Sequence, residues 1–257
     1  MWLSNLFGTY ITRNGKFYCH IGPPKTGTTA IQSALQRATG KKVCYLGTFQ
    51  PRALNEAGGI YSRLMNFVST DADTKSLLMT HTEIDFMLKS GTNVILSDEM
   101  FLVNQGGIDF ERKLLRLNHA VACFPCTIVI SIREPIAAIK LLYLEIYYRQ
   151  AVLPKVSFEQ FLLSNQVRVY DYPYLLTTLK KFGFNNVKFV AVQKGQNSIN
   201  LANITGSRGH SQILPFEDMN QTESTFLKKV DLLAVPENFL KHYSSGYEQV
   251  SHLIQNF

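Results

Sequence analysis

Short, nearly continuous apolar runs recur along the chain and alternate with longer segments of helical spacing. Apolar runs of five or six residues are typical of strands buried on both faces of a sheet, and apolar positions three and four residues apart are typical of helices. The pattern predicts strands at Phe17–Ile21, Val43–Leu46, Asn93–Ser97, Thr127–Ile132 and Val187–Val192. It predicts helices at Thr28–Arg37, Asp73–Lys89 and Ile136–Arg149, the last opened by Pro135.

This alternation of strands and helices predicts a three-layer α/β/α fold with a mainly parallel central sheet. The 257 residues suit one domain, 1–257, in which residues 1–15 form an N-terminal extension. Ligands of parallel sheets bind at the carboxyl ends of the strands. The segments that follow Ile21, Leu96 and Ile132 are therefore where we expect a functional site.

The turn between the first strand and the first helix has the composition of an anion site. It reads His20-Ile21-Gly22-Pro23-Pro24-Lys25-Thr26-Gly27-Thr28-Thr29. Gly22 and Gly27 let the backbone turn tightly and approach a ligand closely. The helix start presents unpaired N–H groups and the positive end of the helix dipole. Lys25 adds a positive charge, and Thr28 and Thr29 add hydroxyl donors.

The spacing of this turn differs from the nucleoside-triphosphatase loop, which requires Gly-x-x-x-x-Gly-Lys-Ser/Thr. Here Thr28 follows Gly27, and Lys25 stands two places before that glycine. A lysine after the glycine reaches the β- and γ-phosphates of a nucleotide, whereas a lysine within the loop suits a shorter anionic group. A nucleoside-triphosphate-dependent kinase with an atypical loop stays open as an alternative.

The run Pro24-Lys25-Thr26-Gly27-Thr28-Thr29 resembles the 5'-phosphosulfate loop of sulfotransferases that use 3'-phosphoadenosine-5'-phosphosulfate (PAPS). The preceding His20-Ile21-Gly22 looks like the bacterial and glycan-modifying branch of that family, and the resemblance covers about residues 17–195. It implies transfer of a sulfuryl group from PAPS to a hydroxyl or amine, with a glycan or glycolipid as candidate acceptor. The coproduct would be 3',5'-ADP, and no metal would be needed.

A second segment, Ser131-Ile132-Arg133-Glu134-Pro135, resembles the family's 3'-phosphate segment. In that pattern an arginine is followed by a proline two places on, a serine eight on and a tyrosine ten on. Arg133, Pro135 and Tyr143 match, but Leu141 stands at the serine position and cannot donate a hydrogen bond. The guanidinium can bind a phosphate through two parallel hydrogen bonds, and the following helix start would add donors.

Two further basic residues are candidates to replace the missing serine: Lys140 on the same helix, and Arg208 in the late polar loop Asn203–His210. For Arg133 the alternative is a surface ion pair with Glu134 or Glu145. The leucine also keeps open a third function, a non-catalytic binding protein on a sulfotransferase scaffold.

The segment Leu96-Ser97-Asp98-Glu99-Met100 closes the third strand. Family members carry a Ser-Ser-Glu-like segment here, so the resemblance implies that Glu99 is the general base. Neighbouring residues at a strand end point in opposite directions, so only one of Asp98 and Glu99 is expected to face the cleft. For each of them the alternative is a helix N-terminal cap or a surface charge. His20, just ahead of the loop, is the second candidate base; the alternative is a hydrogen bond to the loop backbone.

Composition adds three expectations. The net charge of +7 favours anionic partners without choosing among them, and an acidic glycan is one that fits; no nucleic-acid partner is expected. The four cysteines (Cys19, Cys44, Cys123 and Cys126) lack the second pair that a zinc site needs, so we expect reduced thiols. No apolar window reaches the roughly 18 residues of a membrane span and no signal peptide is recognisable, which predicts a cytoplasmic protein.

Overall fold

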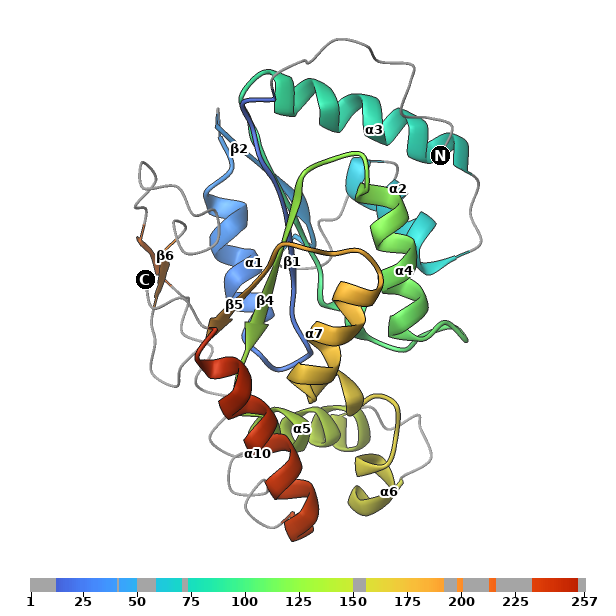
Figure 1. Ribbon diagram of the computed structural model, residues 1–257, viewed down its shortest axis with the longest axis vertical. Coiled ribbons are helices and arrows are strands. Elements are labelled where there is room, and N and C mark those ends of the chain that lie inside the picture. The colour runs from blue at the N-terminus through green and yellow to red at the C-terminus, as the bar shows by residue number, and fades with distance from the viewer. Residues whose placement is uncertain are drawn as a thin grey trace.

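The computed structural model describes residues 13–40, 42–49, 59–70, 74–149, 156–191, 198–200, 213–215 and 233–253. Its centre is a five-stranded sheet whose neighbouring strands are all parallel, in the order β2-β3-β1-β4-β5 (Figure 1). The strands are β1 (Phe17–Ile21), β2 (Val43–Gly47), β3 (Asn93–Ser97), β4 (Cys126–Ile132) and β5 (Val187–Ala191). A second, antiparallel sheet pairs β6 (Ser198–Asn200) with β7 (Ile213–Pro215).

Helices flank this sheet on both faces, which confirms the predicted α/β fold with a parallel sheet (Figure 1). One face carries α1 (Thr28–Arg37), and the other carries α2 (Ile60–Ser69), α3 (Thr74–Lys89) and α4 (Phe110–Val121). The remaining helices are α5 (Pro135–Leu144), α6 (Phe158–Leu162), α7 (Tyr172–Lys181) and α10 (Glu237–Ser251), with α10 packed on α5 and α7. Three short turns are η2 (Glu99–Leu102), η3 (Glu145–Arg149) and η4 (Arg168–Tyr170).

The strands are apolar throughout because both of their faces are buried. In β1, Phe17, Cys19 and Ile21 point into the larger core, beneath α2, α3 and α4. Tyr18, between them, points into the smaller core beneath α1, as does Val129 of β4. Successive side chains of β1 therefore point to opposite faces of the sheet, as expected for a strand and not for a helix.

Most predicted boundaries agree with the structure, but one helix is wrong. β1, α1 and β3 have the predicted limits, and β2 and β4 are each one residue longer. Asp73 and Val192, at the ends of two predicted elements, lie outside the described residues. The helix predicted over 136–149 is α-helical only to Leu144, after which η3 is a π-helix. Periodicity misses this change because π and α turns differ by one position in the hydrogen-bond ladder.

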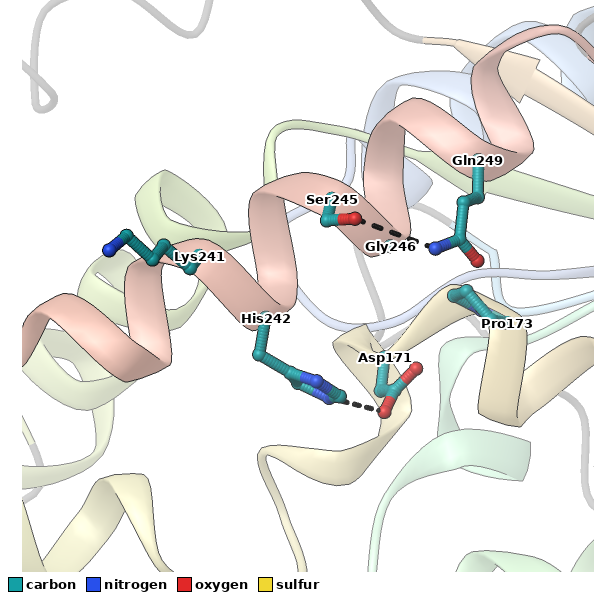
Figure 2. Close-up of a pocket in the computed structure, with 7 residues that line it drawn as sticks. All are labelled: Asp171, Pro173, Lys241, His242, Ser245, Gly246 and Gln249. Carbon is teal, nitrogen blue, oxygen red and sulfur yellow. Dashed lines mark hydrogen bonds and ion pairs between the residues drawn. The ribbon is translucent and has the colours of Figure 1, made fainter.

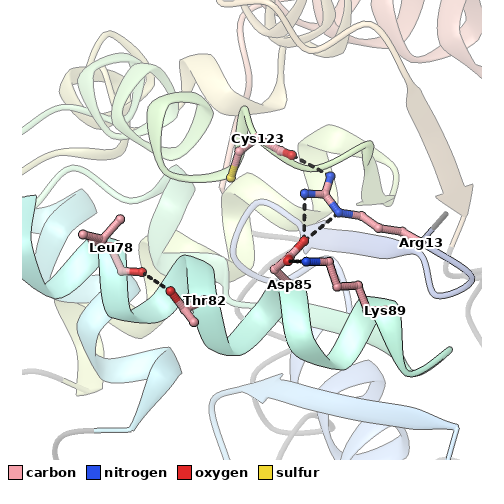
Figure 3. A network of polar contacts seen from close by, with 6 residues as sticks. All are labelled: Arg13, Leu78, Thr82, Asp85, Lys89 and Cys123. Atoms are coloured by element: carbon pink, nitrogen blue, oxygen red, sulfur yellow. Dashed lines mark hydrogen bonds and ion pairs between the residues drawn. The ribbon is translucent and has the colours of Figure 1, made fainter. Parts of the chain in front are cut away.

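Arg13 attaches the start of the described chain to α3 (Figure 3). Its guanidinium donates to the carboxylate of Asp85 and to the carbonyl of Cys123, both at a distance of 2.8 Å. Lys89 forms an ion pair with the same carboxylate at 2.5 Å. All four cysteines are free thiols. Among the described helices, none has the length and apolar composition that crossing a bilayer requires.

The strand order creates a topological switch beside β1. From β1 the chain runs to β2 at the sheet edge, returns to β3 on one side of β1, and then passes to β4 on the other. Connections that diverge from a central strand leave room for a ligand at its carboxyl end. The segments that follow β1, β3 and β4 therefore meet at one place, as the sequence predicted.

Candidate active site

The loop from β1 to α1 leaves the start of α1 without a side-chain cap. Lys25 (φ 66°) and Gly27 (φ 84°) are both left-handed, and Gly27 is the N-cap residue. The helices α4, α5 and α7 begin with side chains that accept their first amides: Asp109, Glu134 and Asp171. The helices α2 and α10 begin without such a cap, as α1 does, but only α1 starts directly behind the central strand. The first-turn N–H groups of α1 thus lack a side-chain acceptor at the sheet's carboxyl edge, which is the condition for binding an external anion.

The protein holds this loop from below through three buried contacts. Thr26 is fully buried, and its hydroxyl donates to the carbonyl of Pro23 (2.7 Å) and lies 3.0 Å from the hydroxyl of Ser131 on β4. The buried phenol of Tyr170 donates to the carbonyl of Pro24 at 2.7 Å. A Cβ on Gly22 would lie 2.0 Å from the Ser131 oxygen, so no side chain fits there. The loop is therefore rigid, and Thr26 supports it from within.

Two carboxylates contact side chains of the loop and of the start of α1. The hydroxyl of Thr28 donates to the carboxylate of Glu99, which stands two residues after the end of β3. The carboxylate of Glu145 forms an ion pair with Lys25 at 2.7 Å. The Lys25 and Glu145 side chains are 30% and 36% exposed, so this pair is open to solvent. Burial chiefly, with the charges of Glu99 and Glu145 among the further causes, raises the pKa of the Tyr170 phenol. The two pairs, Thr28–Glu99 and Lys25–Glu145, therefore both lie within electrostatic reach of Tyr170, and together they are called the cluster.

Asp98 has a structural position beside Glu99. It is 2% exposed, and its carboxylate accepts the amide of Met100 (2.8 Å) and the hydroxyls of Tyr61 and Thr48. Burial raises the pKa of Asp98, while these hydrogen bonds lower it. Asp98 is the N-cap of η2, which is the first of its two alternatives, and it fixes the turn on which Glu99 stands.

Lys113, which the sequence reasoning did not single out, holds the same turn from the other side. Its ammonium, on a side chain that is 1% exposed, donates to the carbonyls of Met100 (3.0 Å) and Val103 (2.7 Å). Burial lowers the pKa of Lys113. Because the carbonyls at the end of η2 are satisfied in this way, the backbone that carries Glu99 has little freedom to move.

His20 is buried near the carboxyl end of β1, 1% exposed. Its Nδ1 is 2.7 Å from the hydroxyl of Ser97 on β3, and not at the loop backbone as one alternative had it. In the described part of the chain, Nε2 is buried without a hydrogen-bond partner. Burial lowers the pKa of His20 to about 4, so the ring is neutral at pH 7. The imidazole therefore supports the end of β1 and the Ser97–Glu99 segment beside it.

This burial predicts a pH-dependent stability. Between pH 6.5 and about 4 the unfolded chain binds a proton at His20 that the folded chain does not, so stability falls as the pH falls through that window. The loss should reach about 3 kcal/mol near pH 4. Urea unfolding at pH 7 and pH 4.5 should show a steeper decline in wild type than in His20→Gln. The exposed His252→Gln should decline as wild type does; equal slopes in all three proteins would contradict the assignment.

Arg133 follows β4, and its backbone is fixed by Tyr172, whose phenol donates to the Arg133 carbonyl (2.7 Å) and accepts its amide (3.2 Å). The expectation that the start of α5 would offer donors to a phosphate is wrong. The Glu134 carboxylate already accepts the amides of Ile136 (3.0 Å) and Ala137 (2.6 Å). The α5 amides are occupied because an acidic N-cap residue, Glu134, stands just before a proline at the first helical position.

No acidic partner of the Arg133 guanidinium is found among the described residues, and Glu145, one of the two suggested, pairs with Lys25 instead. Leu141 is buried in the core, and Tyr143, two residues further on, packs in an aromatic cluster and donates to the carbonyl of Val156. Lys140 is half-buried on α5. Arg208 lies outside the described residues.

A shallow groove of about 390 Å³ lies next to this region, between the start of α7 and α10 (Figure 2). On its floor His242 pairs with Asp171 at 2.8 Å, the same carboxylate that caps α7. None of the residues predicted for the site lines it. The groove is connected to the site through the residues on either side of Asp171. Tyr170 donates to the carbonyl of Pro24 in the loop, and Tyr172 donates to the carbonyl of Arg133.

Besides Lys113, the sequence reasoning missed the roles of three residues near the loop. Ser131 is the first residue of the arginine segment, but its contact with Thr26 was not anticipated. Glu145 entered only as a partner for Arg133. Tyr170 gave no signal, because its contact with Pro24 spans 146 positions of sequence.

No known family model matches the chain, and no curated protein matches it. Among solved structures, a sulfotransferase domain from the curacin biosynthetic pathway aligns with a TM-score of 0.47 at 12% identity, covering 93% of this chain and 99% of that one. Mouse sulfotransferase SULT7A1, complexed with PAP, aligns with 0.41 at 12% identity, covering 96% and 86%. A structure of the PezAT toxin–antitoxin system of Streptococcus pneumoniae aligns with 0.32 at 10% identity, covering 98% and 92%. At these values the similarity carries no functional argument.

Proposed function

We propose that this chain is a sulfotransferase that moves a sulfuryl group from PAPS to a hydroxyl or amine. The observation that carries the proposal is the uncapped start of α1 behind left-handed Lys25 and Gly27, at the carboxyl end of the central strand. A helix start, a lysine and a glycine that admits close backbone approach suit a compact group with several negative charges. The 5'-phosphosulfate of PAPS is such a group, and the loop sequence resembles that of PAPS-dependent enzymes.

The residues of the loop fit this group in kind. Gly27 has no side chain to block an oxygen that approaches the first-turn amides, and its left-handed backbone aims the turn toward them. Lys25 and Thr29, both half-buried, would supply a charge and a hydroxyl, and Pro24 would close the turn. The hydroxyl of Thr26 donates to the carbonyl of Pro23, and that of Thr28 donates to Glu99, so neither is proposed to bind the ligand.

In the proposed reaction, Glu99 takes the proton from the acceptor hydroxyl or amine while its other contact, the Thr28 hydroxyl, holds the carboxylate in place. The acceptor atom forms a bond to sulfur as the bond from sulfur to the phosphate oxygen breaks. The electron pair of that bond leaves with 3',5'-ADP, and Lys25 and the α1 amides stabilise the charge that develops on the leaving oxygen. His20 acts beneath Glu99 as a positioning residue, through Ser97.

The 3'-phosphate would be bound by the guanidinium of Arg133, a residue whose backbone the buried Tyr172 fixes at the end of β4. The start of α5 would not contribute, because Glu134 occupies its amides. Lys140 and Arg208 are the further candidates for this phosphate. The acceptor is proposed to be a glycan or glycolipid, and the net charge of +7 suits an acidic one.

Thermal shift with three nucleotides tests the proposal. At a concentration one hundred times the dissociation constant, 3',5'-ADP should stabilise the fold by about 2.7 kcal/mol, which raises Tm by roughly 5 to 10 °C for a chain of this size. ADP should give a smaller shift because it lacks the 3'-phosphate. A larger shift with ATP and magnesium would favour a kinase instead, and no shift with any nucleotide would favour a binding protein that uses none.

A further inference from the structure

The loop proposed to bind an anion already has an anion beside it. The carboxylate of Glu145 lies 2.7 Å from the Lys25 ammonium, the charge that a bound phosphosulfate would also attract. Two negative groups cannot both be the close partner of one lysine without repelling each other. Either Glu145 orients Lys25 for the ligand, or it competes with the ligand for Lys25.

The exposure of the pair decides between these alternatives. The two side chains are 30% and 36% exposed, and ion pairs of this kind stabilise a fold by at most about 1 kcal/mol. Among the described residues, the Glu145 carboxylate has no second hydrogen bond that would fix it as a guide for Lys25. A multiply charged ligand that also bonds to the α1 amides makes several charge-assisted contacts at once. Such a ligand can displace Glu145 from Lys25. Until it is displaced, the carboxylate repels the approaching ligand.

The position of Glu145 supports a displaceable contact. The residue ends α5 and opens the π-helical turn η3, so it stands where the helical ladder changes its period. Turns of this kind are rare and often occur at functional sites. The loop itself is fixed from below by Ser131 and Tyr170, so the partner that can yield is the carboxylate on η3.

We infer that Glu145 is a built-in competitor for the loop's lysine: it holds Lys25 while no anion is bound and is displaced by di- and polyanionic phosphoryl or phosphosulfate groups. This inference rests on the proposed function, whose ligand it concerns. Its consequence is weaker binding of the nucleotide product, and hence faster release of 3',5'-ADP, than the loop alone would give. Monoanions, which make fewer contacts, displace the carboxylate poorly.

The test compares Glu145→Gln with wild type by calorimetric titration of two probes, inorganic pyrophosphate and 3',5'-ADP, at fixed ionic strength. Removing the competing charge should tighten the binding of both probes by roughly 3- to 10-fold. The matched control is Glu237→Gln, which removes one carboxylate from the exposed Lys241–Glu237 pair on α10 and should change neither affinity. In a Lys25→Met background, Glu145→Gln should tighten binding less, because the lysine for which it competes is gone.

The outcomes separate the inference from the proposed function. If 3',5'-ADP binds wild type and Glu145→Gln binds it equally or more weakly, Glu145 orients Lys25 or is a bystander, and the inference alone falls. If pyrophosphate binds and is tightened while 3',5'-ADP does not bind, the inference stands and the sulfotransferase proposal falls. If neither probe binds either protein, both are overturned.

Discussion

Lys25→Ala should lower kcat by on the order of 10²-fold or more, because it removes the one side-chain charge that the loop can direct at the leaving oxygen. The loss should extend to binding. With Lys25 gone, the carboxylate of Glu145 would face the loop without a partner and repel the nucleotide. The fold should survive, because a partly exposed ion pair contributes less than about 1 kcal/mol. Transfer of label from sulfur-labelled PAPS to an acceptor panel measures the first effect, and titration with 3',5'-ADP the second.

The control for this experiment is Lys241→Ala. Lys241 also forms an ion pair with a glutamate, at 2.8 Å, but it lies on α10 with 77% of its side chain exposed. Removing it changes the net charge of the protein by the same amount, so a fall in activity common to both variants would reflect bulk charge. Near-normal turnover in Lys25→Ala would exclude the lysine from the chemistry and leave the loop as a structural turn.

Local features made the fold and the loop readable from sequence. Each strand is a short apolar run because both of its faces are buried, and that requirement is written in consecutive residues such as Phe17–Ile21. The loop is equally local: Gly27 supplies a left-handed N-cap, and no Ser, Asp or Asn precedes α1 to cap it. An uncapped helix start after a buried strand can therefore be recognised without any knowledge of the fold.

Contacts between distant segments could not be predicted in this way. Tyr170 reaches the Pro24 carbonyl across 146 positions, and Thr26 meets Ser131 across 105, so both depend on how the elements pack. The pairing of Lys25 with Glu145 also depends on where α5 ends and η3 begins, which the apolar pattern of 136–149 does not reveal.

The Glu134-Pro135 step shows a different kind of failure. An acidic residue before a proline at the first helical position is a local capping signal, and the structure uses it as one. The resemblance to a 3'-phosphate segment drew attention to Arg133 and to the helix start together, whereas the carboxylate leaves only the guanidinium for a ligand. The elementary capping rule was the better guide at this position.

Glu99→Gln should lower kcat by roughly 10²- to 10⁴-fold, the usual contribution of a general base, while the affinity for 3',5'-ADP stays unchanged. The amide oxygen of glutamine can still accept the hydroxyl of Thr28, so the variant keeps the contact that holds the side chain and loses only the ability to take a proton. Single-turnover transfer from labelled PAPS, followed beside nucleotide titration, separates the two quantities.

The neighbouring acid provides the discriminating control. Asp98→Asn removes a carboxylate one residue away, but Asp98 is buried and accepts the Met100 amide and the Tyr61 and Thr48 hydroxyls. The NH₂ group of the asparagine would face groups that themselves donate hydrogen bonds. This variant should therefore lose thermal stability. Glu99→Gln should keep the Tm of wild type and lose turnover. If Glu99→Gln transfers sulfuryl groups at the wild-type rate, another group accepts the proton and the carboxylate beside Thr28 only supports the loop.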